Sequence, residues 1–274
     1  MIKFILQSSF LIFLGIPATC YALCEHYGVQ MPWPIYWIIG SSAWLVYLLD
    51  HFVDAQTSKL SISRYNFIGQ RKTLFYWLVG ILVILNIFLV VQFFSWTLFL
   101  FGFLIGLMVF VHQRINTYFV RHSKQAIFKE LFVSIIVALV FAYPILHNYY
   151  EFKGSLSPLF FLLLINMSNV WLFAHMEFEE DQKNGYPSLA VTLGKKRSKQ
   201  MLGQYNFLIL ILLATQWNFW SHKYFLVCLV CMLLSLQLFL RYDVFFKKGD
   251  RYRFWGDFIY LYPLMAALIQ KLSD

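Results

Sequence analysis

The chain has 274 residues, of which 60% are hydrophobic, 20% are aromatic and only 13% are charged. A soluble domain usually carries about a quarter of its residues as charges, so this composition excludes an ordinary soluble protein and predicts an all-α, polytopic membrane protein. The net charge of +9 is also typical of nucleic-acid-binding proteins. Here the basic residues lie in loops between apolar segments, a pattern that membrane topology explains, and we expect no nucleic-acid partner.

Nine apolar segments follow one another along the chain, most of them near the length that a membrane-crossing helix needs. Their ranges are 3–24, 33–49, 73–94, 96–111, 130–147, 158–175, 203–219, 224–241 and 257–270. No linker or low-complexity segment separates them. We therefore expect a single integral membrane domain over residues 1–274, with about nine transmembrane helices.

The distribution of lysine and arginine predicts how this domain lies in the membrane. Nearly all of them belong to the N-terminus or to the long connections 50–72, 112–129, 176–202 and 242–256, which nine crossings would place on one side. The other side keeps only Lys153, Lys223 and Lys271. Basic loops stay in the cytoplasm, so we expect a cytoplasmic N-terminus, an external C-terminus and a location in the plasma (inner) membrane.

Six of the thirteen acidic residues lie in two short clusters, each directly after an apolar segment. The first cluster runs from Asp50 to Asp54 and the second from Glu177 to Asp181. They follow the second and the sixth segment, and this even separation places both on the same side of the membrane. Helical spacing puts Asp50 and Asp54 on one face.

The sixth segment carries a comparable polar stripe. Asn166 and Asn169 share a helical face with Glu177 and with Glu180 or Asp181. Amide side chains are costly against lipid, so we expect both asparagines to face the interior of the bundle. Each stripe then leads from the interior toward carboxylates at the cytoplasmic end.

Carboxylates that gather at one place need a cation. Two of them about 6 Å apart repel by roughly 3 kcal/mol at an effective dielectric of 20. Oxygen ligands of this type suit Mg²⁺, which binds one or two carboxylates together with phosphate oxygens and water. The two clusters therefore predict a Mg²⁺ site and a lipid substrate that carries a diphosphate. The spare cations near the second cluster that could bind the same phosphates are Lys183, Lys195, Lys196 and Arg197.

The two acidic motifs resemble those of the UbiA superfamily of intramembrane prenyltransferases, whose members have nine helices and Asp-rich motifs after helices two and six. The stretch from Glu177 to Gly194 is the more similar. The residues in register with the family pattern are Glu177, Glu179, Asp181, Gly185, Ser188, Leu189, Val191, Leu193 and Gly194. In the first motif, Asp50 replaces the usual Asn, and His51 and Ser58 replace aspartates. The chain thus resembles a divergent member.

This resemblance implies a Mg²⁺-dependent transferase that moves an isoprenyl group from an isoprenyl diphosphate to an aromatic or lipid acceptor within the membrane. Asp54 and Asp181 would be catalytic. The metal ligands would be Asp50, Asp54, Glu177, Glu180 and Asp181. The substrate-binding side chains would be Asn166, Asn169, Arg64, Arg71, Lys183, Lys195, Lys196 and Arg197. Two alternatives stay open: a cyclase or lyase that releases diphosphate, and a non-catalytic lipid-binding or transport protein with the same fold.

Overall fold

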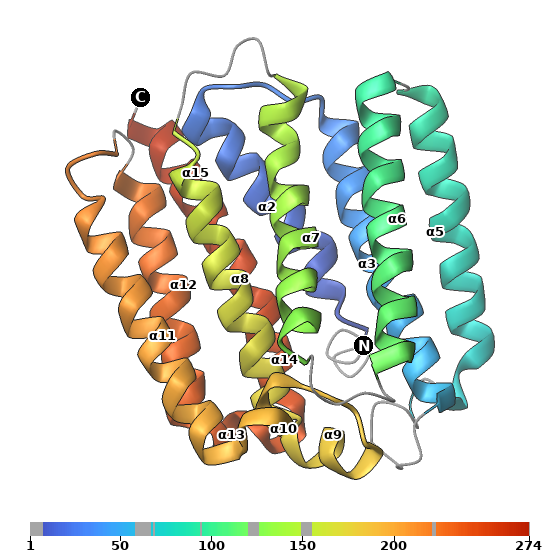
Figure 1. Ribbon diagram of the computed structural model, residues 1–274. Coiled ribbons are helices and arrows are strands. Elements are labelled where there is room, and N and C mark those ends of the chain that lie inside the picture. The colour runs from blue at the N-terminus through green and yellow to red at the C-terminus, as the bar shows by residue number, and fades with distance from the viewer. Residues whose placement is uncertain are drawn as a thin grey trace.

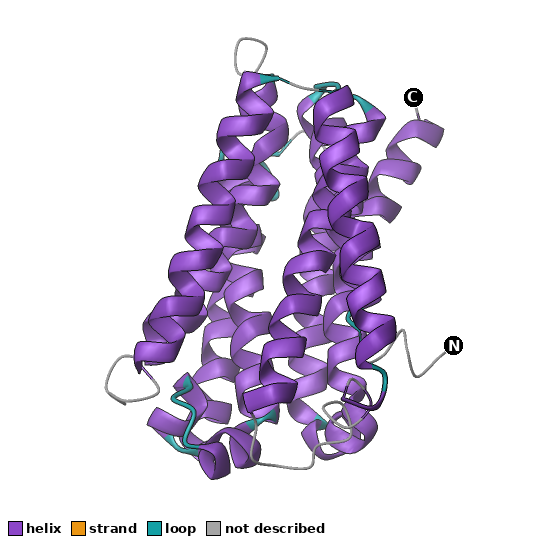
Figure 2. Cartoon of the chain, turned by 90° about the vertical axis from the view of Figure 1, so that its right-hand side faces the viewer, coloured by secondary structure: helices purple, strands orange, loops and turns teal. Residues whose placement is uncertain are grey.

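The computed structural model describes residues 8–57, 67, 69–93, 95–119, 126–148, 155–220 and 223–273. These residues form a bundle of helices that run roughly along one long axis, and the described part of the chain contains no strand (Figure 1, Figure 2). The all-α fold predicted from composition is confirmed.

Eight long helices and a final composite segment build the bundle. The long helices are α2 (Phe10–Tyr27), α3 (Trp33–Thr57), α5 (Lys72–Gln92), α6 (Trp96–Phe119), α7 (Ala126–His147), α8 (Ser157–Met176), α11 (Lys195–Thr215) and α12 (Lys223–Arg241). The last segment consists of α14 (Arg251–Phe258), η3 (Ile259–Leu261) and α15 (Tyr262–Ser273). Short helices connect the long ones: α9 (Phe178–Asn184), α10 (Leu189–Leu193), α13 (Asp243–Lys247) and η2 (Lys248–Asp250).

Six of the described helices are long and apolar enough to cross a membrane, namely α2, α5, α6, α7, α8 and α12. The helices α3, α11 and α14–α15 fall outside this set, so the count of nine crossings stays a prediction. For α11 the reason is visible in the sequence, because its first turns carry Lys195, Lys196, Arg197 and Lys199.

Large apolar side chains cover much of the outer surface. They are densest on α5 and α6, where Trp77, Ile84 and Phe103 are among the exposed residues, and these two helices form one edge of the bundle (Figure 1). A soluble protein rarely exposes apolar patches of this extent. The surface therefore fits a protein surrounded by lipid.

Three glycines bring the helices of the bundle close together. A Cβ atom on Gly40 of α3 would lie 2.5 Å from the carbonyl oxygen of Phe13 in α2, and one on Gly15 of α2 would lie 2.8 Å from Tyr260 Cβ in η3. A Cβ on Gly256 of α14 would collide with the Phe173 ring of α8. Small residues at helix contacts are a common means of close packing in membrane bundles.

The short helices α9, α10 and α13 all lie at one end of the bundle, and α3 and α8 end there as well (Figure 1). Both acidic motifs therefore belong to the same end, as predicted from the even number of segments between them.

Candidate functional site

The second acidic motif is built by a break between two helices. Helix α8 ends at Met176, and α9 begins after the single residue Glu177, with Glu179, Glu180 and Asp181 in its first turn. Acidic side chains are favourable at a helix N-terminus. Gly185 ends α9 with a φ of 72°, a conformation that suits glycine. The motif thus holds its carboxylates on a short helix at the end of the bundle.

The residues after α9 fix the start of the next helix. Ser188 is the N-cap of α10, and its side chain accepts a hydrogen bond from the backbone nitrogen of Val191. The backbone nitrogen of Leu189 donates to Oε1 of Glu130 in α7, at 2.8 Å. Ser188, Leu189 and Val191, three of the residues in register with the family pattern, therefore shape this turn.

Glu177 is held by the last segment of the chain. Its Oε1 atom accepts hydrogen bonds from the guanidinium of Arg253 and from the hydroxyl of Tyr252, the latter at 2.7 Å. The Arg253 side chain is only 10% exposed and its guanidinium lies 5.7 Å from the centre of the Phe173 ring. A carboxylate in this setting is neutralised by a cation that belongs to the protein.

Glu179 and Asp243 are paired in the same way. Glu179 forms ion pairs with Lys195 and Lys247, and these hydrogen bonds lower its pKa to about 2. Asp243 contacts Lys199 Nζ at 3.0 Å and His175 Nε2 at 3.4 Å. Burial alone would raise the pKa of Asp243, but these two hydrogen bonds outweigh burial and keep the pKa below its ordinary value.

The other predicted metal ligands are Asp50, Asp54, Glu180 and Asp181, and the structure describes the side chains of all of them except Asp54. Asp50 lies exposed near the end of α3, and Glu180 and Asp181 lie partly exposed on α9. The backbone of Asp54 belongs to α3, but its side chain lies outside the described residues. Among the side chains that the structure describes, no three of His, Cys, Asp or Glu come together as a metal site.

The predicted cations lie in several places. Arg71 precedes α5 and its guanidinium lies 4.2 Å from the centre of the Phe67 ring, and Lys183 lies in the last turn of α9. Lys196 is exposed on α11, and Arg197 lines an outer groove. Arg64 lies outside the described residues.

The two asparagines of α8 face the interior, as predicted. Asn166 and Asn169 are 2% and 3% exposed. Asn166 donates to the carbonyl oxygen of Ser134 in α7 at 3.2 Å and accepts from the Tyr260 hydroxyl, and Asn169 donates to the carbonyl oxygen of Gly256 at 3.1 Å. They link α8 to its neighbours, while Asn169 Oδ1 is buried without a hydrogen bond from any described residue.

Sequence reasoning missed the contribution of the last segment. Besides Tyr252 and Arg253, α14 carries Asp257, which is 3% exposed and lies near Ser9. Ser9 Oγ in turn lies 3.2 Å from His51 Nε2, in the first motif. An ionisable residue at the edge of an apolar segment is itself a functional signal, and Asp257 and Glu130 both occupy such positions.

Comparison with known proteins agrees with this architecture. The model of the UbiA prenyltransferase family matches residues 127–261, just under half of the chain, from the start of α7 to the end of η3. This match supports membership of the UbiA superfamily. The match includes the second acidic motif and the α14 residues that hold it. It begins after the first motif, which is the part that departs from the UbiA pattern.

A solved structure extends the likeness over the whole chain. It comes from work on a digeranylgeranylglyceryl phosphate synthase in membranes, covers 100% of both chains with a TM-score of 0.52 and is 14% identical in sequence. At this identity the similarity concerns the fold. No match was found among curated proteins.

Proposed function

We propose that this UbiA-superfamily protein is a Mg²⁺-dependent prenyltransferase, which moves an isoprenyl group from an isoprenyl diphosphate to an aromatic or lipid acceptor within the membrane. One observation carries the proposal: the segment matched by the family model, residues 127–261, contains the acidic helix α9 together with the cations that surround it. A polyanionic substrate needs such an arrangement of metal-binding and cationic groups at the membrane surface.

The chemistry of the side chains at this end of the bundle fits Mg²⁺. The proposed ligands are the carboxylates of Asp50, Asp54, Glu177, Glu180 and Asp181. Because Mg²⁺ takes only one or two protein carboxylates besides phosphate and water, a pair from α3 or α9 is sufficient for each ion. When bound, Mg²⁺ neutralises the diphosphate and makes it a better leaving group. Asp54 and Asp181 are the proposed catalytic carboxylates.

The protein's own cations would hold the diphosphate in place. Lys183 lies in the last turn of α9, and neither it nor Lys196 forms an ion pair with any described residue, whereas Lys195 is already paired with Glu179. Arg64 and Arg71 would reach the phosphates from the side of the first motif. The remaining predicted contacts are those of Asn166 and Asn169 in the interior. Arg197 lines a separate groove on α11, so we leave it out of the proposed diphosphate site.

The decisive experiment measures diphosphate release by the detergent-purified protein from a panel of isoprenyl diphosphates, with mixed aromatic acceptors and with Mg²⁺ or EDTA. We expect release only with Mg²⁺, and a loss of about a hundredfold or more in Asp181→Asn, as for removal of one transition-state-stabilising group. The matched control is Glu25→Gln, whose carboxylate pairs with Lys271 instead. Equal turnover in Asp181→Asn and in the control would refute the site.

A second candidate function is supported by the ion pairs themselves. Glu177 and Glu179 are already neutralised by Arg253, Lys195 and Lys247, and two aspartates of the family's first motif are replaced. A protein that binds or carries isoprenyl diphosphates would show Mg²⁺-dependent binding without release. A cyclase or lyase would release diphosphate without needing any acceptor, so the same assay separates all three functions.

A further inference from the structure

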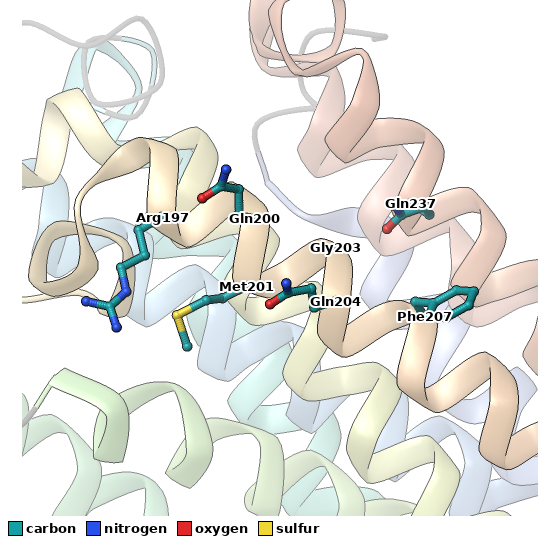
Figure 3. Close-up of a pocket in the computed structure, with 7 residues that line it drawn as sticks. All are labelled: Arg197, Gln200, Met201, Gly203, Gln204, Phe207 and Gln237. Atoms are coloured by element: carbon teal, nitrogen blue, oxygen red, sulfur yellow. The ribbon is translucent and has the colours of Figure 1, made fainter.

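A groove of about 900 Å³ lies on the surface between α11 and α12 (Figure 3). Gly203 forms part of its wall, and the side chains that line it are Arg197, Gln200, Met201, Gln204, Phe207 and Gln237. This groove is distinct from the acidic cluster, since it opens on the outer face of α11.

The outer face of α11 changes from charged to polar to apolar along the helix. Arg197 lies in the first turn, and Gln200 and Gln204 follow at helical spacing on the same face. Phe207 comes next and is 64% exposed, and the exposed Leu208 and Ile211 continue the apolar part. This order matches the order of layers that a helix meets when it enters a leaflet: phosphate, ester groups and hydrocarbon.

The cations at the start of α11 divide between two faces. Lys195 and Lys199, one turn apart, pair with Glu179 and Asp243. Arg197 is one of the residues that line the groove, with its guanidinium extended away from Gln237 (Figure 3), and it makes no ion pair with any residue that the structure describes. A guanidinium at this position is available to an anion from outside the protein.

A buried hydrogen-bond chain orients the amide on the other wall. Ser168 in α8 donates to Asn206 Oδ1 in α11, and Asn206 Nδ2 donates to Gln237 Oε1 in α12 at 3.1 Å. The oxygen of Gln237 is thereby engaged, and its amide nitrogen is directed to Gly203 in the groove wall, 3.7 Å from where a Cβ of that glycine would lie. Amide donors that face lipid are costly unless an acceptor is supplied.

We propose that this groove binds one anionic phospholipid. Its phosphate would pair with Arg197, which suits phosphate geometry, its ester carbonyls would accept from the amides of Gln200, Gln204 and Gln237, and one acyl chain would lie along Phe207. The charge and the amide donors select this occupant over a purely apolar one. The site is independent of prenyl transfer.

The test compares retention of phosphatidylglycerol and phosphatidylcholine, with identical acyl chains, by native mass spectrometry of the full chain in detergent. We expect one phosphatidylglycerol to be retained in preference to phosphatidylcholine. Arg197→Gln should weaken that preference about fivefold, the usual effect of one basic residue near anionic lipid. Gln204→Leu, at an exposed position in the groove, should weaken binding of both lipids.

The matched control is Arg114→Gln, an exposed arginine near the end of α6 that contacts the Phe110 ring. It should retain phosphatidylglycerol as the unmodified protein does. Equal retention of the two lipids would overturn the proposal, and so would a loss of phosphatidylglycerol in the Arg114→Gln control equal to that in Arg197→Gln. A dimer of the chain that dissociates in the Gln204→Leu variant would also overturn it, because the groove would then be a protein interface.

Discussion

At the scale of single residues, the acidic motif is best understood through its partners. Glu177 and Arg253 are separated by 76 positions in the sequence and meet because Gly256 lets α14 approach α8. The sequence predicts that Glu177 belongs to a charged cluster, since that requires only local spacing. It does not predict which cation neutralises Glu177, because this depends on how two distant helices pack.

The pairing of Glu177 with Arg253 can be tested by a double-mutant cycle. Arg253→Met leaves a partly buried carboxylate without its cation, and we expect it to destabilise the protein by about 2 kcal/mol, between the values for surface and fully buried pairs. Glu177→Leu should have a similar cost. Chemical unfolding in detergent would measure both. The double variant should cost less than the sum; simple additivity would show that the two side chains do not interact.

The pKa of Glu179 makes a second prediction at this scale. Because the folded pKa of about 2 lies below the ordinary value of 4.5, the two lysines stabilise the ionised form. Its contribution is therefore full above about pH 4.5 and is lost as the pH falls toward 2. With the side chain 46% exposed, Glu179→Gln should cost less than about 1 kcal/mol at pH 7.

Thermal midpoints of the Glu179→Gln variant and of the unmodified protein would be compared at pH 7 and at pH 3. The gap between them should shrink at the lower pH. Lys247→Met serves as the companion variant, since it removes one partner of the carboxylate without changing Glu179 itself. A gap that stays constant with pH would contradict the ion pairs as the cause.

At the scale of helices, the apolar segments correctly predict where most of the long helices lie, but not where they end. Helix α3 continues to Thr57, beyond the apolar segment that ends at residue 49, because backbone hydrogen bonds do not require apolar side chains. Helix α9 is too polar, and α10 too brief, to be seen as an apolar segment. They are nevertheless the elements that carry and orient the second motif.

Close helix packing gives a prediction for Gly40. Its missing side chain lets α3 approach the carbonyl oxygen of Phe13 in α2, and backbone cannot move aside as a flexible side chain can. Gly40→Ala should therefore cost about 1–3 kcal/mol. Gly80→Ala on α5 is the matched control, since nothing lies within 4 Å of its Cβ position, and it should be neutral or stabilising by about 0.5–1 kcal/mol. Equal effects in chemical unfolding would disprove the packing argument.

At the scale of the whole molecule, composition predicts the fold class and the second motif predicts the superfamily, whereas the first motif remains the weakest part of the site. Asp50 is described, but the side chain of Asp54 and the residues 58–66 are not. The motif also lies outside the segment that the family model matches. The first motif is therefore the part in which the chain departs most from the UbiA pattern.

Nine crossings, together with the basic connections on one side, predict that the two termini lie on opposite sides of the membrane. Helix α2 starts toward the end of the bundle that carries α9 and α13, and α15 ends at the other (Figure 1). In a bacterial host, alkaline phosphatase fused after residue 274 should be active outside the cytoplasm, whereas a fluorescent protein fused there should stay dark. A fusion at Gly194, between α10 and α11, should behave in the opposite way. If only the six most apolar helices crossed, the termini would share one side, and the C-terminal fluorescent fusion would be bright.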